Sequence, residues 1–121
     1  MEFSGGRISA VQVTRTVTVI DNLIPVITLV GGAVDLFLND AYVEQGATAS
    51  DNIDGDLTDS IIIDSSAVDN TTPGSYSVTY NVSDAAGNAA SQVTRTVTVI
   101  DNVIPVITLV GGAVVLFNND E

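Results

Sequence analysis

The sequence predicts an all-β protein in which about seven short strands form two antiparallel sheets packed face to face. Three observations point to this class. Apolar side chains alternate with polar ones, valine, threonine and isoleucine dominate the candidate strands, and no window has helical periodicity. Clusters of aspartate, asparagine, proline and glycine separate the candidate strands, as is typical of antiparallel sandwiches.

The first predicted strand region is "PVITLVGGAVDLFLN", which begins at Pro25. Its two apolar segments are separated by Gly31 and Gly32, and glycine inside a strand marks a bend or a bulge. We therefore expect an edge strand that is broken at these glycines and crosses from one sheet to the other. Two further short strands are expected at 47–49 and 60–64.

The segment "YSVTYNVSD", which begins at Tyr76, has the clearest strand pattern in the chain. Its serine, threonine and asparagine side chains occupy one face, and its aromatic and valine side chains occupy the other. This alternation predicts an antiparallel strand with one face on the core. The residues expected on the core face are Tyr76, Val78, Tyr80 and Val82.

The segment "QVTRTVTVI", which begins at Gln92, predicts a second long strand. Its period of two places Val93, Val97 and Val99 on the core face, together with Arg95. Because an arginine can bury its aliphatic part while its charged end stays solvated, we expect Arg95 near the open end of the strand. Its guanidinium would there reach water or an acidic side chain.

The chain contains an internal repeat with an offset of 80 residues. Residues 12–40 and 92–120 can be aligned over 29 positions and differ at three of them. The repeat predicts three parts: a tag or linker plus the last strand of a preceding repeat (1–20), a complete repeat (21–100), and a linker plus the first strands of a following repeat (101–121). Pro25 and Pro105 restrict the backbone where repeats join, so we expect a semi-rigid joint.

The charge of the chain excludes several classes of partner. The chain has fifteen acidic residues and three arginines, which gives a net charge of -12. Such a field repels nucleic acid and anionic membranes and attracts cations, so we expect no nucleic-acid partner. No segment approaches the roughly 20 apolar residues of a membrane-spanning helix, so direct membrane insertion is not expected either.

Cysteine and histidine are both absent. Their absence excludes disulfides, the usual zinc ligands and nucleophilic catalysis based on a Ser/His or Cys/His pair. Paired carboxylates remain, but no residues of a recognisable catalytic cleft accompany them, so we expect no enzymatic activity. A hard cation that prefers oxygen ligands is the kind of metal that this chain can hold.

Four segments, "PVITL", "GATASDNIDGDLT", "TPGSYSVTYNVSDAAGN" and "TRTVTVID", closely resemble the immunoglobulin-like repeats of bacterial surface proteins and large adhesins, which also occur in some pesticidal crystal proteins. The resemblance covers about residues 21–100 and continues into both flanks. It implies an extracellular or cell-surface immunoglobulin-like (Ig-like) sandwich, arranged in tandem, that acts as a spacer or adhesive module without catalysis.

Several acidic segments are expected to meet at one end of this sandwich. In a seven-stranded sandwich the entering linker lies at the same pole as two of the loops, here "DNIDGD" and "DAAGN". Calcium takes six to eight oxygen ligands from carboxylates, amides, carbonyls and water, and these segments can supply them. The candidate calcium ligands are Asp21, Asn22, Asp51, Asn52, Asp54, Asp56, Asp84 and Asn88.

A structural role for the same residues is the alternative interpretation. Aspartate and asparagine stabilise turns through their own side chains, so these loops are also ordinary turn sequences. "DGD" does not match an EF-hand loop, because Gly55 is misplaced and the required glutamate is missing. Outside these loops, Glu44 is expected at the opposite pole, where it would face Asp101 and Asn102.

Three functions are compatible with these features. The first is a structural spacer or adhesive module of a bacterial tandem-repeat protein, whose partners are the adjacent repeats and whose joints calcium stiffens. The second is a filament subunit that completes the sheets of neighbouring subunits by strand exchange, because the chain has two copies of a first and of a last strand. The third is a module whose loop tips bind a glycan or another ligand on a host surface.

Overall fold

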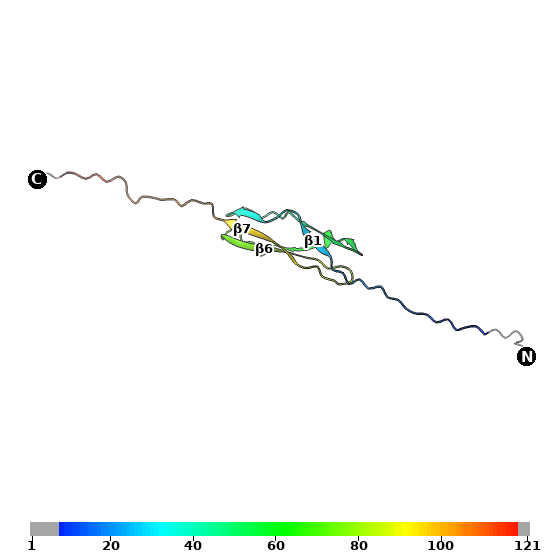
Figure 1. Cartoon of the computed structure of the whole chain (residues 1–121). Helices are drawn as coiled ribbons and strands as arrows, with labels where there is room; N and C mark the ends of the chain where they lie inside the picture. The colour runs from blue at the N-terminus through cyan, green and yellow to red at the C-terminus, as the bar shows by residue number, and fades with distance from the viewer. Residues whose placement is uncertain (1–7, 119–121) are drawn as a thin grey trace, which may run out of the picture.

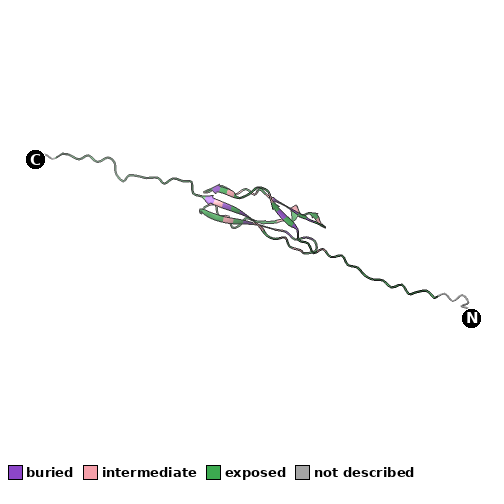
Figure 2. Ribbon diagram, in the orientation of Figure 1, coloured by how far each residue is buried: buried purple, intermediate pink, exposed green. Residues whose placement is uncertain are grey.

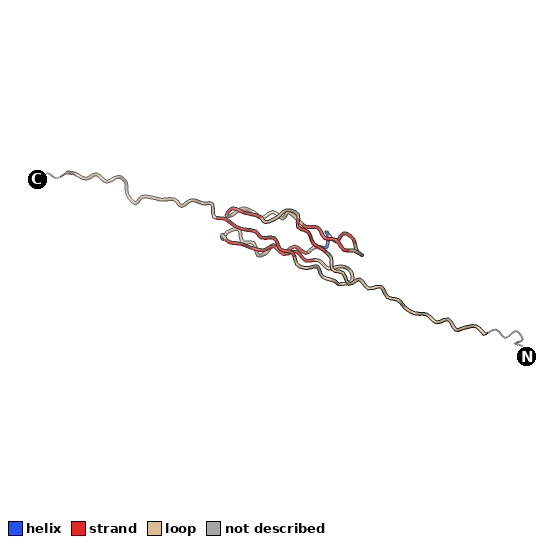
Figure 3. Tube along the Cα trace, in the orientation of Figure 1, coloured by secondary structure: helices blue, strands red, loops and turns tan. Residues whose placement is uncertain are grey.

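The computed structural model describes residues 8–118 and consists of a two-sheet β sandwich with an extended segment at each end (Figure 1; Figure 3). The predicted all-β class is confirmed, and the sandwich lies between residues 26 and 100. A single turn of 3-10 helix, η1 (Thr58–Ser60), is its only helical element among the described residues. The strands are β1 (Val26–Leu29), β2 (Val34–Phe37), β3 (Ala47–Asp51), β4 (Gly55–Asp56), β5 (Ile62–Asp64), β6 (Gly74–Asn81) and β7 (Val93–Ile100).

The strands form one sheet in the order β1-β3-β4 and a second in the order β2-β7-β6-β5. Every pairing is antiparallel except that of β2 with β7, which is parallel and places Phe37 opposite Ile100. The predicted edge strand is therefore confirmed, since β1 belongs to one sheet and β2 to the other. The crossing favours glycine at Gly31, because its φ is +79°, a backbone conformation that other residues rarely adopt.

The core lies between the two sheets and follows the predicted alternation (Figure 2). The side chains predicted to face inward from β7 and from the segment beginning at Tyr76 are buried, except that Tyr76 and Val93 are half-buried at the edge of the core. Every buried residue of the described chain lies between Pro25 and Val99, so the unit 21–100 carries its own core. The buried apolar residues are Ile27, Leu36, Ala47, Ala49, Val78, Tyr80, Val82, Val97 and Val99.

The two flanks, 8–20 and 101–118, leave the sandwich at opposite ends and lie extended (Figure 1). Val17 is 78% exposed, whereas Val97, its counterpart 80 residues later, is fully buried. The same local sequence is thus a core strand in β7 and an unpaired segment in the flank, because only β7 has partner strands. The assignment of the flanks to neighbouring repeats stays a prediction, and residues 1–7 of the predicted tag or linker lie outside the described residues.

In residues 8–118 the structure contains no helix with the length and apolar character needed to cross a membrane.

Candidate metal centre

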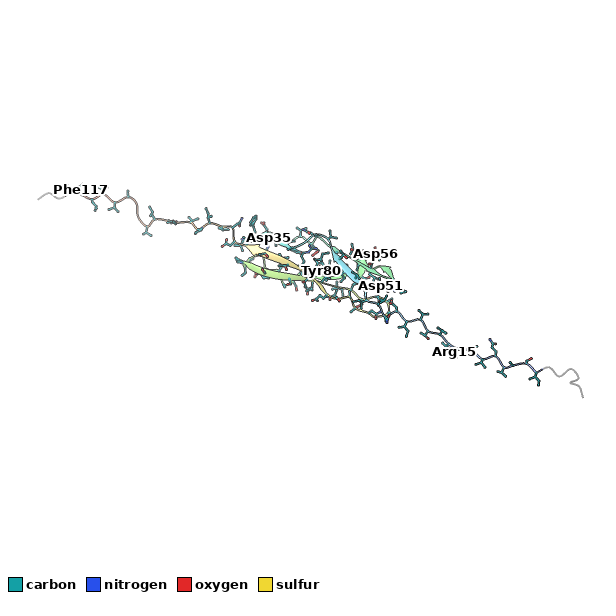
Figure 4. The ribbon with its side chains drawn as sticks, viewed as in Figure 1. Arg15, Asp35, Asp51, Asp56, Tyr80 and Phe117 are labelled. Atoms are coloured by element: carbon teal, nitrogen blue, oxygen red, sulfur yellow. The ribbon has the colours of Figure 1, made fainter. Side chains whose placement is uncertain are left out.

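Three segments converge at the end of the sandwich where the N-terminal flank enters, which we call the N-terminal pole. They are the linker at 21–22, the segment 51–56 that runs from the end of β3 through the turn into β4, and the turn at 84–88 that precedes β7. Figure 4 shows Asp51 and Asp56 at this pole and Asp35 toward the opposite end. The structure therefore places together the segments that the sequence predicted to meet.

Four carboxylates form a cluster at this pole, which we call the acidic cluster. Asp21, Asp51, Asp54 and Asp84 each offer one oxygen, and these oxygens all lie within 4.8 Å of one another. Asp51 and Asp84 are buried, whereas Asp21 lies closer to solvent. Because like charges at such distances repel, the cluster is an arrangement that favours a cation.

Asp51 is the central residue of the acidic cluster. As the last residue of β3, it accepts hydrogen bonds at Oδ2 from the backbone N–H groups of Ile53 (2.9 Å) and Asp54 (3.0 Å), which close the turn to β4. Its other oxygen, Oδ1, is buried and has no hydrogen-bond partner, and the residue is only 9% exposed. A buried oxygen without a partner costs free energy, so binding of a ligand at Asp51 Oδ1 would be favourable.

Asp84 is held by Asn88. The backbone N–H of Asn88 donates to Asp84 Oδ1 (2.8 Å), and Asn88 Nδ2 donates to Asp84 Oδ2 (2.9 Å) and to the carbonyl oxygen of Asp21 (2.9 Å). Burial opposes ionisation of Asp84, but these hydrogen bonds outweigh it and lower the pKa of the carboxyl group. Asn88 therefore positions two cluster residues and ties the linker to the 84–88 turn.

Asp54 joins the two turns to each other, whereas the hydrogen bond of the Asp21 side chain stays within the linker. Asp54 Oδ2 accepts a hydrogen bond from the backbone N–H of Ala85 (2.7 Å), and Asp21 Oδ1 accepts one from Leu23 (3.1 Å). The hydrogen bond from Leu23 favours the ionised form of Asp21, but desolvation and the negative charges of Asp51 and Asp84 outweigh it and raise the pKa. The pole therefore disfavours the Asp21 charge when no cation compensates it.

The remaining predicted ligands lie outside the acidic cluster. Asp56 is exposed, and its Oδ1 accepts a hydrogen bond from the backbone N–H of Thr58 (2.9 Å); interaction with Thr58 lowers its pKa. Asn22 and Asn52 are exposed and line a shallow hollow beside the cluster. Of the eight candidate ligands, the structure thus brings four carboxylates together and gives Asn88 a positioning role.

The acidic cluster fits a hard cation such as calcium. Calcium accepts carboxylates in mono- or bidentate geometry, so four of them can supply much of the six to eight oxygens it requires. A cation placed among them would also give the buried Asp51 Oδ1 a partner. The ligands come from the linker and from two separate turns, so binding would join these segments.

A second polar cluster lies inside the sandwich, around Arg95. Of the two expected contacts of Arg95, the one with an acidic side chain is confirmed, since Glu44 lies 3.8 Å away, and the one with water is wrong, since the residue is 1% exposed. Its guanidinium donates to the backbone carbonyls of Val30, Gly32 and Gly46 at 2.6–2.9 Å and to Tyr80 Oη at 2.9 Å. In the break between β1 and β2, the carbonyls of Val30 and Gly32 have no strand partner, and the arginine satisfies them instead.

Glu44 belongs to this interior cluster, and the expectation that it faces Asp101 at the opposite pole was wrong. Its carboxylate accepts hydrogen bonds from Tyr42 Oη (2.6 Å), from Tyr80 Oη (2.6 Å) and from the backbone N–H of Gly46 (2.8 Å), and it lies 3.8 Å from Arg95. A buried positive charge requires such a counter-charge. The alternation that placed Arg95 on the core face is the sequence signal that indicates this requirement.

We expect Glu44→Gln to lower the free energy of unfolding by about 2 kcal/mol at neutral pH, because it removes charged hydrogen bonds in the interior. Burial opposes the charge of Glu44, but its hydrogen bonds and Arg95 lower its pKa below the ordinary value of 4.5. Its stabilising effect is therefore present above pH 4.5 and is lost as the pH falls through the lower folded-state pKa.

The measurement is urea unfolding of both proteins between neutral and acidic pH. The stability difference should shrink in acid, because the wild-type carboxylate is then protonated as well. The exposed Asp35→Asn is the charge-matched control and should leave stability nearly unchanged. A difference that is constant down to the most acidic pH would contradict the role of the Glu44 charge.

Comparison with known proteins identifies one family. The model of the family described as bacterial surface protein, Ig-like domain, matches residues 27–99. A search of curated proteins found no significant match.

Two solved structures share the fold of this chain. The lipoprotein BT2262 from Bacteroides thetaiotaomicron is 33% identical with a TM-score of 0.54, and the match covers 67% of this chain and 40% of the lipoprotein. The structure of CBM51-2 in complex with GlcNAc and INT domains, from Clostridium perfringens ZmpB, is 30% identical with a TM-score of 0.52. That match covers 64% of this chain and 17% of the ZmpB chain, so this chain spans less than half of either protein.

Proposed function

Because the chain belongs to the family of bacterial surface proteins with an Ig-like domain, we propose that it is a structural spacer or adhesive module of an extracellular tandem-repeat protein whose joints calcium stiffens. The family supports a location at the cell surface. The sandwich supports a mechanical role, because its flanks leave from opposite ends and successive repeats would extend end to end (Figure 1). The module acts without catalysis in this proposal.

The observation that carries the calcium proposal is the buried Asp51 Oδ1, which has no hydrogen-bond partner and lies among three other carboxylates. Without a cation, the negative charges at the pole repel the linker residue Asp21. With a cation, each repulsion is replaced by an attraction, and Asp21 is held against two turns of the sandwich. The linker then loses freedom and the joint stiffens.

Calcium concentration would control this stiffening. Extracellular calcium modules bind with a Kd of about 10⁻⁴ to 10⁻³ M, which matches calcium outside cells and far exceeds its concentration in the cytosol. At tenfold over the Kd, binding contributes about 1.4 kcal/mol to the stability of the folded form. The module would therefore become rigid after secretion.

The test compares two equivalent aspartates in the same chain. Asp21 and Asp101 are counterparts 80 residues apart, and each accepts a similar hydrogen bond from the residue two positions later, at 3.1 Å and 3.0 Å. We expect calcium to reduce the fast backbone motion of residues 20–24, measured by ¹⁵N relaxation, in the wild type and in Asp101→Asn. In Asp21→Asn this reduction should be largely lost, because the linker no longer offers a carboxylate to the cluster.

The matched substitution separates a specific site from a general response to charge. Both variants remove one negative charge from the same local sequence, but only Asp21 lies within the acidic cluster. An equal calcium response in Asp21→Asn and in the wild type would contradict the proposed joint.

Strand exchange between subunits is a second candidate function, and the exposed apolar side chains of the flanks favour it. Val19 is 91% exposed and Ile107 is 90% exposed. The N-terminal flank repeats the sequence of β7 from Gln12 to Ile20, so it can occupy the place of β7 in another subunit with the same side-chain pattern. Head-to-tail repetition of this exchange would produce a filament.

Val17→Asp tests strand exchange without disturbing the sandwich. Val17 is exposed in the flank, but it would become buried in an exchanged strand because its counterpart Val97 is fully buried. If the chain assembles, Val17→Asp should shift it to monomer in size-exclusion chromatography with light scattering. Thr16→Asp is the control and should still assemble, because its counterpart Thr96 is exposed on β7. A monomeric wild type at high concentration would contradict this candidate.

A further inference from the structure

An apolar surface lies beside the acidic cluster at the N-terminal pole. Ile20 and Leu23 of the entering chain and Ile53 of the β3–β4 turn line the shallow hollow there, and they are 74%, 54% and 65% exposed. Three large apolar side chains gathered around one hollow are more than the scattered exposed residues of an ordinary surface. We call these three residues the apolar patch of the N-terminal pole.

The opposite end of the sandwich carries apolar side chains as well. Phe37 at the end of β2 is 51% exposed, and Ile100 at the end of β7 is 38% exposed. The parallel pairing of β2 with β7 places these two residues opposite each other, one strand spacing apart. The chain continues from Ile100 directly into the next linker.

The repeat shows how these two surfaces come together. Ile20 is the counterpart of Ile100, and Ile20 already lines the hollow with Leu23 and Ile53. In a tandem array, the phenylalanine that corresponds to Phe37 in the preceding repeat would lie beside Ile20, about 5 Å away across the sheet. Only residues 21–25 separate Ile20 from β1, and Asn88 holds the carbonyl oxygen of Asp21, so the preceding repeat has little freedom to lie elsewhere.

We propose that Leu23 and Ile53 of this apolar patch are the docking surface for the end of the preceding repeat that carries Phe37 and Ile100, with that Ile100 in the position of Ile20. The occupant is a second copy of this sandwich, joined through the linker. Burial of apolar side chains drives this contact, so it forms without calcium and differs in origin from the stiffening proposed above. Successive repeats then stabilise one another.

The test uses a chain in which residues 21–100 are duplicated in tandem, which is suitable because each unit carries its own core. All measurements are made with a calcium chelator present. We expect the two-repeat chain to unfold with a midpoint about 4–8 °C above that of the single-repeat chain. Ile53→Ser in the second repeat, or Phe37→Ser in the first, should remove most of this increase.

The same substitutions in the other repeat are the matched controls. Ile53→Ser in the first repeat and Phe37→Ser in the second lie at outer ends, where no neighbouring sandwich contacts them, and they should leave the increase in place. Equal midpoints for the one-repeat and two-repeat chains, or equal effects at the inner and outer positions, would overturn the proposal. A calcium effect on the linker would be unaffected by either outcome.

Discussion

Arg95→Met is expected to lower the free energy of unfolding by about 3–5 kcal/mol, since it leaves the half-buried Glu44 without its counter-charge and removes the donor of several interior hydrogen bonds. The carbonyls of Val30 and Gly32 would also lose the donor that satisfies them, and Gly46 would keep only its hydrogen bond from the backbone N–H of Val30. Small domains are stable by only about 5–15 kcal/mol in total, so the variant should unfold at much lower denaturant concentration. Chemical unfolding followed by circular dichroism measures this difference.

The chain contains a matched control for this substitution. Arg15 is the counterpart of Arg95 within the repeated segment, but it lies exposed in the N-terminal flank (Figure 4). Arg15→Met makes the same chemical change in the same local sequence and should leave the stability of the sandwich unchanged. A loss for Arg95→Met below about 1 kcal/mol would mean that the interior cluster does not stabilise the crossing between β1 and β2.

Asp51→Asn is expected to abolish stabilisation by calcium while leaving the calcium-free protein as stable as the wild type or more stable. The amide oxygen of asparagine can still accept the hydrogen bonds of Ile53 and Asp54, so the turn is preserved. The amide also removes one charge from a cluster of four carboxylates, which relieves repulsion. In the wild type, calcium at tenfold over its Kd should raise the melting temperature by about 5–10 °C.

Asp56→Asn is the control for the calcium effect. It removes one negative charge from the same turn, but Asp56 lies outside the acidic cluster. Its melting temperature should rise with calcium as in the wild type. If Asp51→Asn and Asp56→Asn respond to calcium equally, the binding is a diffuse effect of the acidic pole and no defined site exists.

The fold could be predicted from the sequence because local pattern and tertiary structure agree. The alternation in β6 and β7 matches the faces that are buried, and the two glycines mark the point where the edge strand changes sheets. Alternation alone could not separate β7 from the flank with the same sequence, because pairing depends on partner strands. The two-residue strand β4 was not predicted, since it follows from the turn that Asp51 and Gly55 close.

The position of the acidic cluster was predicted from topology and its four carboxylates were among the predicted ligands, but the sequence did not separate them from the other four candidates. Loop order places the acidic segments at one pole, whereas side-chain direction decides which residues meet. The Asp56 side chain accepts a hydrogen bond from the backbone N–H of Thr58, and the Asn88 side-chain amide donates to Asp84 and to the carbonyl oxygen of Asp21 in the linker. The hydrogen-bond partners of Arg95 could not be predicted either. They include carbonyls that lack a strand partner only because the chain crosses from one sheet to the other between β1 and β2.

A calcium titration of the wild-type chain, followed by the chemical shifts of its backbone amides, tests the central claim most directly. The account predicts that the amides of Ile53, Asp54, Ala85 and Asn88 shift together and saturate with one Kd of about 10⁻⁴ to 10⁻³ M, while the amide of Val103 stays unchanged. Val103 provides the comparison because its turn at Asp101 repeats that of Asp21 without an acidic cluster. No saturable shift at the pole up to about 10 mM calcium, or equal shifts at Val103, would contradict the account.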